Sequence, residues 1–251
     1  DVMQVSIKID GLDAVQRQLG SLAKQASYAA SRAINTTAYA INAKLKTEMA
    51  STFQGGATAY TLRAFSVTKA DKTNLTATVA LRTDNKGAAL PYSKALGHLF
   101  TGGQRKYKKL EGWLRSRKLL PNGLTVAPGA GMPLDQYGNM RRSTLTEMLG
   151  VVGTQRTNLR VFRKSGAGKA QKATGYFVVL PSITKGARHP GIYKRIETGN
   201  TSTIKPMVLY VDPVNYRRFI NLEKLGREVV NKTFQPAFDA ELSKAIASAR
   251  P

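Results

Sequence analysis

One long amphipathic segment, residues 11–53, constrains the fold of this chain more than any other feature. Its apolar residues recur every three or four positions, which is the spacing that places side chains on one face of an α-helix. Gly20 and Ser21 interrupt the pattern, because glycine costs a helix about 1 kcal/mol relative to alanine and serine can cap a new start. The sequence therefore predicts a short helix followed by a long one.

The long helix carries mainly alanine on its apolar face, which lets a partner approach closely. These alanines are Ala26, Ala29, Ala30, Ala33 and Ala38. An alanine removes far less apolar area from water than a valine, leucine or phenylalanine does, so close packing against larger side chains must compensate. The C-terminal segment supplies such side chains, and we expect them to lie across the alanine face. They are Phe219, Leu222, Val229, Phe234 and Phe238.

The other elements follow from two further patterns. Alternating or continuous apolar runs predict strands, and residues 62–70 and 75–82 form a β-hairpin around the turn at 71–74. The remaining predicted strands are residues 5–9, 176–180, 191–196 and 207–211. Residues 215–249 read as a helix that Pro236 kinks or splits in two. The fold class predicted is α+β, a mixed or antiparallel sheet packed by a long N-terminal helix and a C-terminal helix, with a basic loop-rich insertion.

We expect a single elaborated domain over residues 1–251. Its parts are 1–82 (strand, long helix and hairpin), a basic Gly-rich insertion at 83–174, and 175–251 (strands and C-terminal helix). A chain of 251 residues buries about 70–75% of its unfolded surface on folding, so its core is large enough to be stable without disulfides or bound metal ions. The absence of cysteine also excludes disulfides. Neither a run of 18 apolar residues nor a signal peptide is present, which predicts a soluble protein without membrane contact.

Charge is the most unusual property of the composition. The chain has 39 Lys and Arg against 15 Asp and Glu, a net charge of +24, whereas a small domain typically carries about 2–8 charges of net excess. Such an excess favours a polyanionic partner, with solubility alone as the alternative. No acidic residue occurs between Glu147 and Glu197. We expect DNA or an acidic partner to contact the cations of this region: Arg156, Arg160, Arg163, Lys164, Lys169, Lys172, Arg188, Lys194 and Arg195.

Catalytic, cofactor and metal sites are not predicted. The segment SGAGKA at 165–170 resembles a phosphate-binding loop, but Arg163 stands where that motif needs its first glycine and Ala170 where it needs Ser or Thr. His98 and His189 are the only histidines, and neither has a zinc-binding spacing.

Carboxylates are also too scattered for chemistry. Glu111, Asp135 and Glu147 are isolated in the basic region, so no pair of acids is available for two-metal catalysis. We therefore expect a protein that is not an enzyme. Trp113 is predicted to lie on the apolar face of a short basic helix, and stacking on a nucleic-acid base is the alternative.

Two segments resemble the minor tail protein Z family of tailed phages, the tail-completion proteins typified by phage lambda. IKIDGLDAVQRQL followed by AASRAINTTAYAINAKL is similar to the family's opening, a strand-to-helix turn and a helix with the pattern A-hN-x-TA. RHPGIYKRIETGNTSTIKPMVLYVDP resembles its H-x-G-h-[FY]-K-R segment and the strands that follow. Residues 83–174 match neither segment, and the family's middle region is usually shorter. The second match is carried by His189, Gly191, Ile192, Tyr193, Lys194 and Arg195.

The resemblance implies a non-enzymatic virion component at the upper end of the tail or at the head–tail neck, made in the host cytoplasm. It further implies a homo-oligomeric ring, most plausibly six-fold, bound to other tail or neck proteins and to DNA by backbone contacts without sequence preference. In this interpretation Lys194 and Arg195 pair with acidic groups of an adjacent subunit; in the alternative they are solvated. A sequence-independent nucleic-acid-binding protein outside a virion, and an enzyme acting on nucleic acid, are the rival functions.

Overall fold

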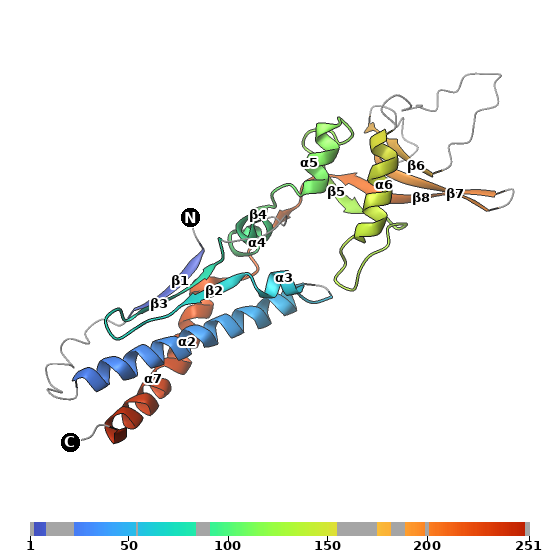
Figure 1. Cartoon of the computed structure of the whole chain (residues 1–251). Helices are drawn as coiled ribbons and strands as arrows, with labels where there is room; N and C mark the ends of the chain where they lie inside the picture. Colours follow the sequence, from blue (N-terminus) through green and yellow to red (C-terminus); the bar gives the residue numbers. More distant parts are fainter. Residues whose placement is uncertain are drawn as a thin grey trace, which may run out of the picture. The chain divides into compact units, whose positions relative to one another are not determined.

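The computed structural model describes residues 3–8, 23–53, 55–83, 91–154, 175–181, 189–198 and 201–248. The chain divides into two compact units (Figure 1). The first comprises residues 1–105 and 215–251, and the second comprises residues 106–214. This division differs from the predicted single domain with an insertion at 83–174. Residues 91–105 belong to the first unit, whereas the strands between 175 and 211 share a core with residues 106–154 in the second.

The first unit contains a three-stranded antiparallel sheet in the order β1-β3-β2. These strands are β1 (Gln4–Lys8), β2 (Phe65–Thr68) and β3 (Thr76–Leu81). The period-two alternation buries Ala77, Val79 and Leu81 on one face of β3, and the predicted hairpin is confirmed. A short helix, α3 (Ala59–Leu62), leads into β2, and the Thr58 hydroxyl caps it by accepting a hydrogen bond from the Thr61 N–H.

Two long helices pack against this sheet. They are α2 (Ala23–Thr52) and α7 (Leu222–Ser248), and Figure 1 shows them side by side. The predicted long helix is thus confirmed, while the predicted short helix before Gly20 lies outside the described residues. α7 passes through Pro236 without splitting. Pro236 has no N–H to donate to the carbonyl of Lys232, four residues earlier in the helix. Both residues are exposed, so water can satisfy the Lys232 carbonyl instead.

The alanine face of α2 is completely buried. All five alanines named above have an exposed fraction of 0%, and α7 runs antiparallel along α2 with Arg32 3.6 Å from Glu241. The predicted packing of the C-terminal helix on α2 is confirmed, with one correction. Phe219 precedes α7 and is 43% exposed, so it does not contribute to the helix pair.

Small elements that the sequence did not reveal complete the first unit. α4 (Tyr92–Thr101) buries Leu96, Leu99 and Phe100 in the same core. The two-residue strands β4 (Gly103–Gln104) and β9 (Asn215–Tyr216) pair where the chain leaves the first unit and returns to it.

The second unit has its own antiparallel sheet, in the order β5-β8-β7-β6. Its strands are β5 (Thr125–Pro128), β6 (Gly175–Val179), β7 (Gly191–Thr198) and β8 (Thr201–Val211). Its helices are α5 (Lys109–Ser116) and α6 (Arg142–Thr154). The core includes Leu114, Met148, Ile192, Val208 and Tyr210. The predicted fold class is confirmed: the chain is α+β, with antiparallel sheets and long helices near both ends.

Asn35 connects α2 to the β2–β3 hairpin through two hydrogen bonds. Its side-chain amide donates to the Ala70 carbonyl at 2.9 Å and accepts from the Ala70 N–H at 2.8 Å. Ala70 is buried, so these bonds satisfy backbone groups that water cannot easily reach. Thr37, two residues later, is also buried and donates its hydroxyl to the Ala33 carbonyl. The helix motif of the resemblance therefore has a structural role.

We expect Asn35→Ala to lower the free energy of unfolding by about 1–3 kcal/mol, because it leaves both backbone groups of Ala70 unsatisfied. Thr36→Ala is the matched control, since Thr36 is exposed on the same helix. Urea unfolding and amide exchange of Ala70 measure the difference. Equal stability and equal exchange in the two variants would contradict this role of Asn35.

Candidate functional site

Most of the predicted DNA-contacting cations fall on residues whose placement the structure does not describe. These are Arg156, Arg160, Arg163, Lys164, Lys169, Lys172 and Arg188, and all seven lie outside the described residues. Their contact with DNA stays a prediction. The sequence-predicted residues that can be placed are those of the motif segment, 189–195.

The first half of the motif segment builds strand β7. Gly191 lies against β8 so closely that a Cβ there would overlap the carbonyl oxygen of Val208. Ile192 is completely buried. The Tyr193 hydroxyl donates a 2.7 Å hydrogen bond to the His189 carbonyl, and its ring stacks on Phe177 with centroids 5.8 Å apart. These residues therefore hold the sheet of the second unit together.

Lys194 joins α6 to two strands of the sheet. Its Nζ lies 3.3 Å from Glu147 Oε1 and 3.3 Å from the Tyr176 hydroxyl, and 4.8 Å from the centre of the Tyr176 ring. The hydrogen bond to Tyr176 and the Glu147 carboxylate raise the pKa of Lys194. A lysine nucleophile or base needs a lowered pKa, so this arrangement favours a lasting cation.

Lys194 thus has an acidic partner within its own unit and is not simply solvated, while its predicted pairing with an acidic group of an adjacent subunit stays a prediction. The physical reason for the pair within the unit is the packing of α6 on β6, which brings Glu147 to β7 although 47 positions separate the two residues. Arg195 is half-buried on the same strand, and its predicted contact with a neighbouring subunit stays a prediction.

A cationic and aromatic surface around α5 is a candidate nucleic-acid interface, although none of its cations was among the predicted contact residues. The sequence predicted the short basic helix and placed Trp113 on its apolar face, and Trp113 does pack against the core of the second unit. We call this surface the α5 surface, and its residues are Lys106, Tyr107, Lys108, Lys109, Trp113, Arg115, Arg117 and Lys118. The Arg115 guanidinium lies 3.6 Å from the centre of the Tyr107 ring, and that of Arg117 lies 3.9 Å from the Trp113 ring. Tyr107 is 44% exposed. Lys and Arg can contact phosphates, while exposed rings can stack on bases.

Glu111 is the only acidic residue between Lys106 and Lys118, and its carboxylate points inward. Its exposed fraction is 0%; Oε2 accepts the Lys108 N–H at 2.6 Å and Oε1 accepts the Val126 N–H at 3.0 Å. The carboxylate therefore caps α5 and ties it to β5. As a result the outward charge of the α5 surface is almost entirely positive.

The other carboxylates singled out in the sequence also make structural contacts. Asp135 accepts the N–H groups of Tyr137 and Asn139, both at 2.9 Å, and these bonds, that of Asn139 first, lower its pKa. Glu147 pairs with Lys194. Within the described residues, no three His, Asp or Glu side chains form a group that could hold a metal ion.

Comparison with known proteins adds no relative. The chain matches no protein-family model, and no curated protein or solved structure is significantly similar to it. Of the helices that the structure describes, none combines the length and the apolar character that crossing a membrane requires.

Two buried tyrosines provide a matched test of the second unit. Tyr210 is 1% exposed, and its hydroxyl has no hydrogen-bond partner among the residues that the structure describes; burial raises its pKa. We expect Tyr210→Phe to raise the free energy of unfolding by about 1 kcal/mol, because it removes an unsatisfied buried group. Tyr193→Phe deletes the hydrogen bond to the His189 carbonyl and should lower the free energy of unfolding by about 1 kcal/mol. Urea unfolding measures both; shifts of the same sign would contradict this assignment.

Proposed function

We propose that this chain is a structural protein of a tailed-phage virion, a tail-completion or neck subunit that forms a ring, most plausibly hexameric. It binds other tail or neck proteins, and its basic surface contacts DNA or acidic neighbours. The resemblance of its two segments to minor tail protein Z supports this function, together with the net charge of +24.

The main observation behind the proposal is that residues of the two resembling segments have structural roles. Asn35 and Thr37 hold the helix and hairpin of the first unit, and Gly191 and Tyr193 hold the sheet of the second. They lie in different units, each of which has its own core. An enzyme motif is expected to gather side chains in one cleft. Residues that maintain a scaffold instead suit a protein whose role is assembly.

The basic surface suits a partner that binds mainly through electrostatic attraction. A virion component that meets the genome needs contacts with phosphates, which position DNA without reading its sequence. The α5 surface offers cations on a folded helix whose one acid is buried. An acidic neighbouring protein would be attracted by the same surface.

The particle itself tests this function. We expect purified phage particles to contain the chain in several copies, arranged with cyclic symmetry at the tail end or neck, because closed rings use one repeated contact. Cryo-electron microscopy of the particle, with antibody labelling of the chain, locates it. Absence from the particle, a single copy, or a position remote from both the tail tube and the neck would exclude the proposal.

The α5 surface also favours a second function, sequence-independent nucleic-acid binding outside a virion. Replacing Lys106, Lys109 and Lys118 by Gln should weaken binding to duplex DNA and lower the salt dependence of log K by about 0.9 for each phosphate that the variant no longer neutralises. Fluorescence anisotropy over a salt series measures both quantities.

A matched variant separates local contacts from net charge. Replacing the exposed Lys24, Lys46 and Lys232 of the first unit by Gln removes the same number of charges away from α5. We expect the salt dependence of this variant to stay close to that of the unchanged chain. If both variants lose affinity equally, the α5 surface is not the DNA contact.

A further inference from the structure

The turn between α5 and β5 contains the pair Asn122–Gly123, and no other asparagine of the chain precedes a glycine. Both residues are exposed. A hydrogen bond from the Leu124 N–H to the Pro121 carbonyl closes the turn, and its length of 3.4 Å lies beyond the usual range for such bonds. The turn can therefore open locally without disturbing the core of the second unit.

The backbone nitrogen of Gly123 is accessible to the Asn122 side chain. Across the described residues, neither the Gly123 N–H nor the Asn122 side chain has a hydrogen-bond partner. Glycine has no Cβ to shield its nitrogen, and even a Cβ built at Gly123 would meet nothing within 4 Å. Two adjacent groups of one chain react far more readily than separate molecules do, because little entropy is lost when they meet.

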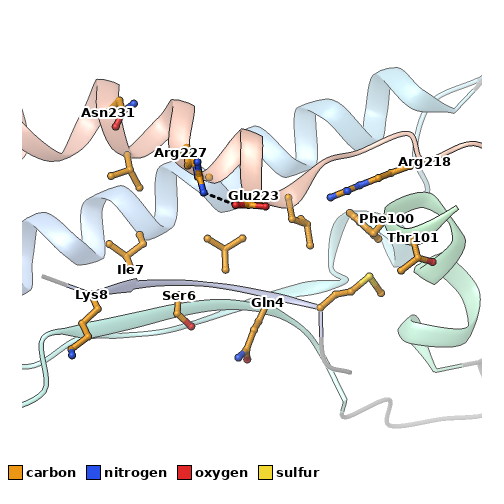
Figure 2. A pocket seen from close by; sticks show the side chains of 15 residues that line it. Gln4, Ser6, Ile7, Lys8, Phe100, Thr101, Arg218, Glu223, Arg227 and Asn231 are labelled. Atoms are coloured by element: carbon orange, nitrogen blue, oxygen red, sulfur yellow. Dashed lines mark hydrogen bonds and ion pairs between the residues drawn. The ribbon is translucent and has the colours of Figure 1, made fainter. Parts of the chain in front are cut away.

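Two other exposed asparagines lack these conditions. Asn231 lies on α7 (Figure 2), where the N–H of the next residue is bonded within the helix. Asn139 lies in a loop, but its side-chain amide donates to the Asp135 carboxylate at 3.4 Å, and the bulky Met140 follows it. Exposure alone therefore does not distinguish Asn122, whereas its pairing with an unshielded and unbonded glycine nitrogen does.

We propose that Asn122–Gly123 is a modification site, at which the chain deamidates itself in water. Hydroxide removes the Gly123 N–H proton, and the nitrogen forms a bond to the side-chain carbonyl carbon of Asn122. The C–N bond of the side-chain amide breaks, and the leaving nitrogen takes protons from water and departs as ammonia. Water then opens the resulting succinimide at either carbonyl carbon, which leaves an aspartate or an isoaspartate at position 122. The net reaction consumes one water and releases one ammonia, without oxidation or reduction.

The position of the turn gives this reaction a consequence for the α5 surface. The Leu124 carbonyl accepts a 2.8 Å hydrogen bond from the Arg115 guanidinium, which lies over the Tyr107 ring. An isoaspartate adds one carbon to the backbone of the turn, so the Leu124 carbonyl shifts relative to Arg115. Either product also adds a carboxylate close to these cations. The proposal concerns the chain itself and does not rest on its place in a virion.

Mass spectrometry of the full chain, digested after incubation at neutral pH and physiological temperature, tests the proposal. We expect the peptide that contains position 122 to gain the mass difference between an amide and an acid, and to separate into aspartate and isoaspartate forms. Its rate should lie within about tenfold of that of a free peptide of residues 117–127, because the fold leaves the turn unprotected. The peptides that contain Asn139 and Asn231 should react at least about tenfold more slowly.

Two substitutions establish the mechanism. Asn122→Gln keeps an amide whose carbonyl carbon is one bond further from the nitrogen, and it should abolish the reaction at position 122. Gly123→Ala shields the nitrogen with a methyl group and should slow the reaction at least about tenfold. Gly123 has a φ of 84°, which alanine adopts only with strain, so circular dichroism checks the fold of this variant. If Gly123→Ala does not fold, Asn122→Gln provides the test.

Amide exchange shows the consequence for the turn. We expect the Leu124 N–H, which closes the turn, to exchange faster in the incubated chain than in Asn122→Gln incubated alongside it.

Three outcomes would overturn the proposal. The first is a rate at position 122 more than about a hundredfold below that of the free peptide, which would show that the fold protects the turn. The second is equal loss of the amide at Asn139, which would show that exposure alone decides. The third is an unchanged rate in a folded Gly123→Ala variant, because direct hydrolysis of the side-chain amide does not use the glycine nitrogen.

Discussion

The contact between α2 and α7 is the interaction on which the first unit depends. Five alanines of α2 are completely buried, and Ile34, Ile41, Leu45 and Met49 of the same helix fill the core above the sheet. A helix lined with alanine gains little from each residue, so its stability comes from close approach over a long length. α7 supplies that approach from the far end of the chain. The first unit therefore closes only when residues before 105 and after 215 are both present.

The first unit is built from both sides of residues 106–214, which explains how the second unit can lie between its two parts in the sequence. The chain leaves the first unit after Arg105 and returns at Asn215, and β4 pairs with β9 at that point, Gly103 opposite Tyr216 and Gln104 opposite Asn215. The backbone hydrogen bonds between β4 and β9 therefore bring together the two ends of the loop formed by residues 106–214. The entropy of closing a loop grows only slowly with its length, so a connection of this size costs little more than a short one.

Sequence patterns revealed the elements that are long, together with the short helix α5, and they missed several other short elements. α2, α7 and the β2–β3 hairpin follow from spacings of 3.6 and 2 residues, and strands β6 and β8 of the second sheet follow from continuous apolar runs. β5 and β4 are too short to show a pattern, and α4 is a helix of 10 residues flanked by Pro91 and Gly102. The division into two units was not predictable, because it depends on which distant residues share a core. Glu111 and Glu147 appeared isolated for the same reason: their partners Val126 and Lys194 become neighbours only after folding.

The positive surface of this protein follows partly from how its few acids are used. Glu111 is buried on two backbone N–H groups, and Asp71 accepts hydrogen bonds from the Thr73 hydroxyl and the Thr73 and Asn74 N–H groups, which lower its pKa. Carboxylates held in this way fix local structure and neutralise little of the surrounding surface. The cations that remain repel one another in the isolated chain, and an anionic partner relieves this repulsion. DNA and an acidic protein both meet that requirement. The α5 surface suits DNA in particular, because its cations are carried on side chains, which can follow phosphates in any register.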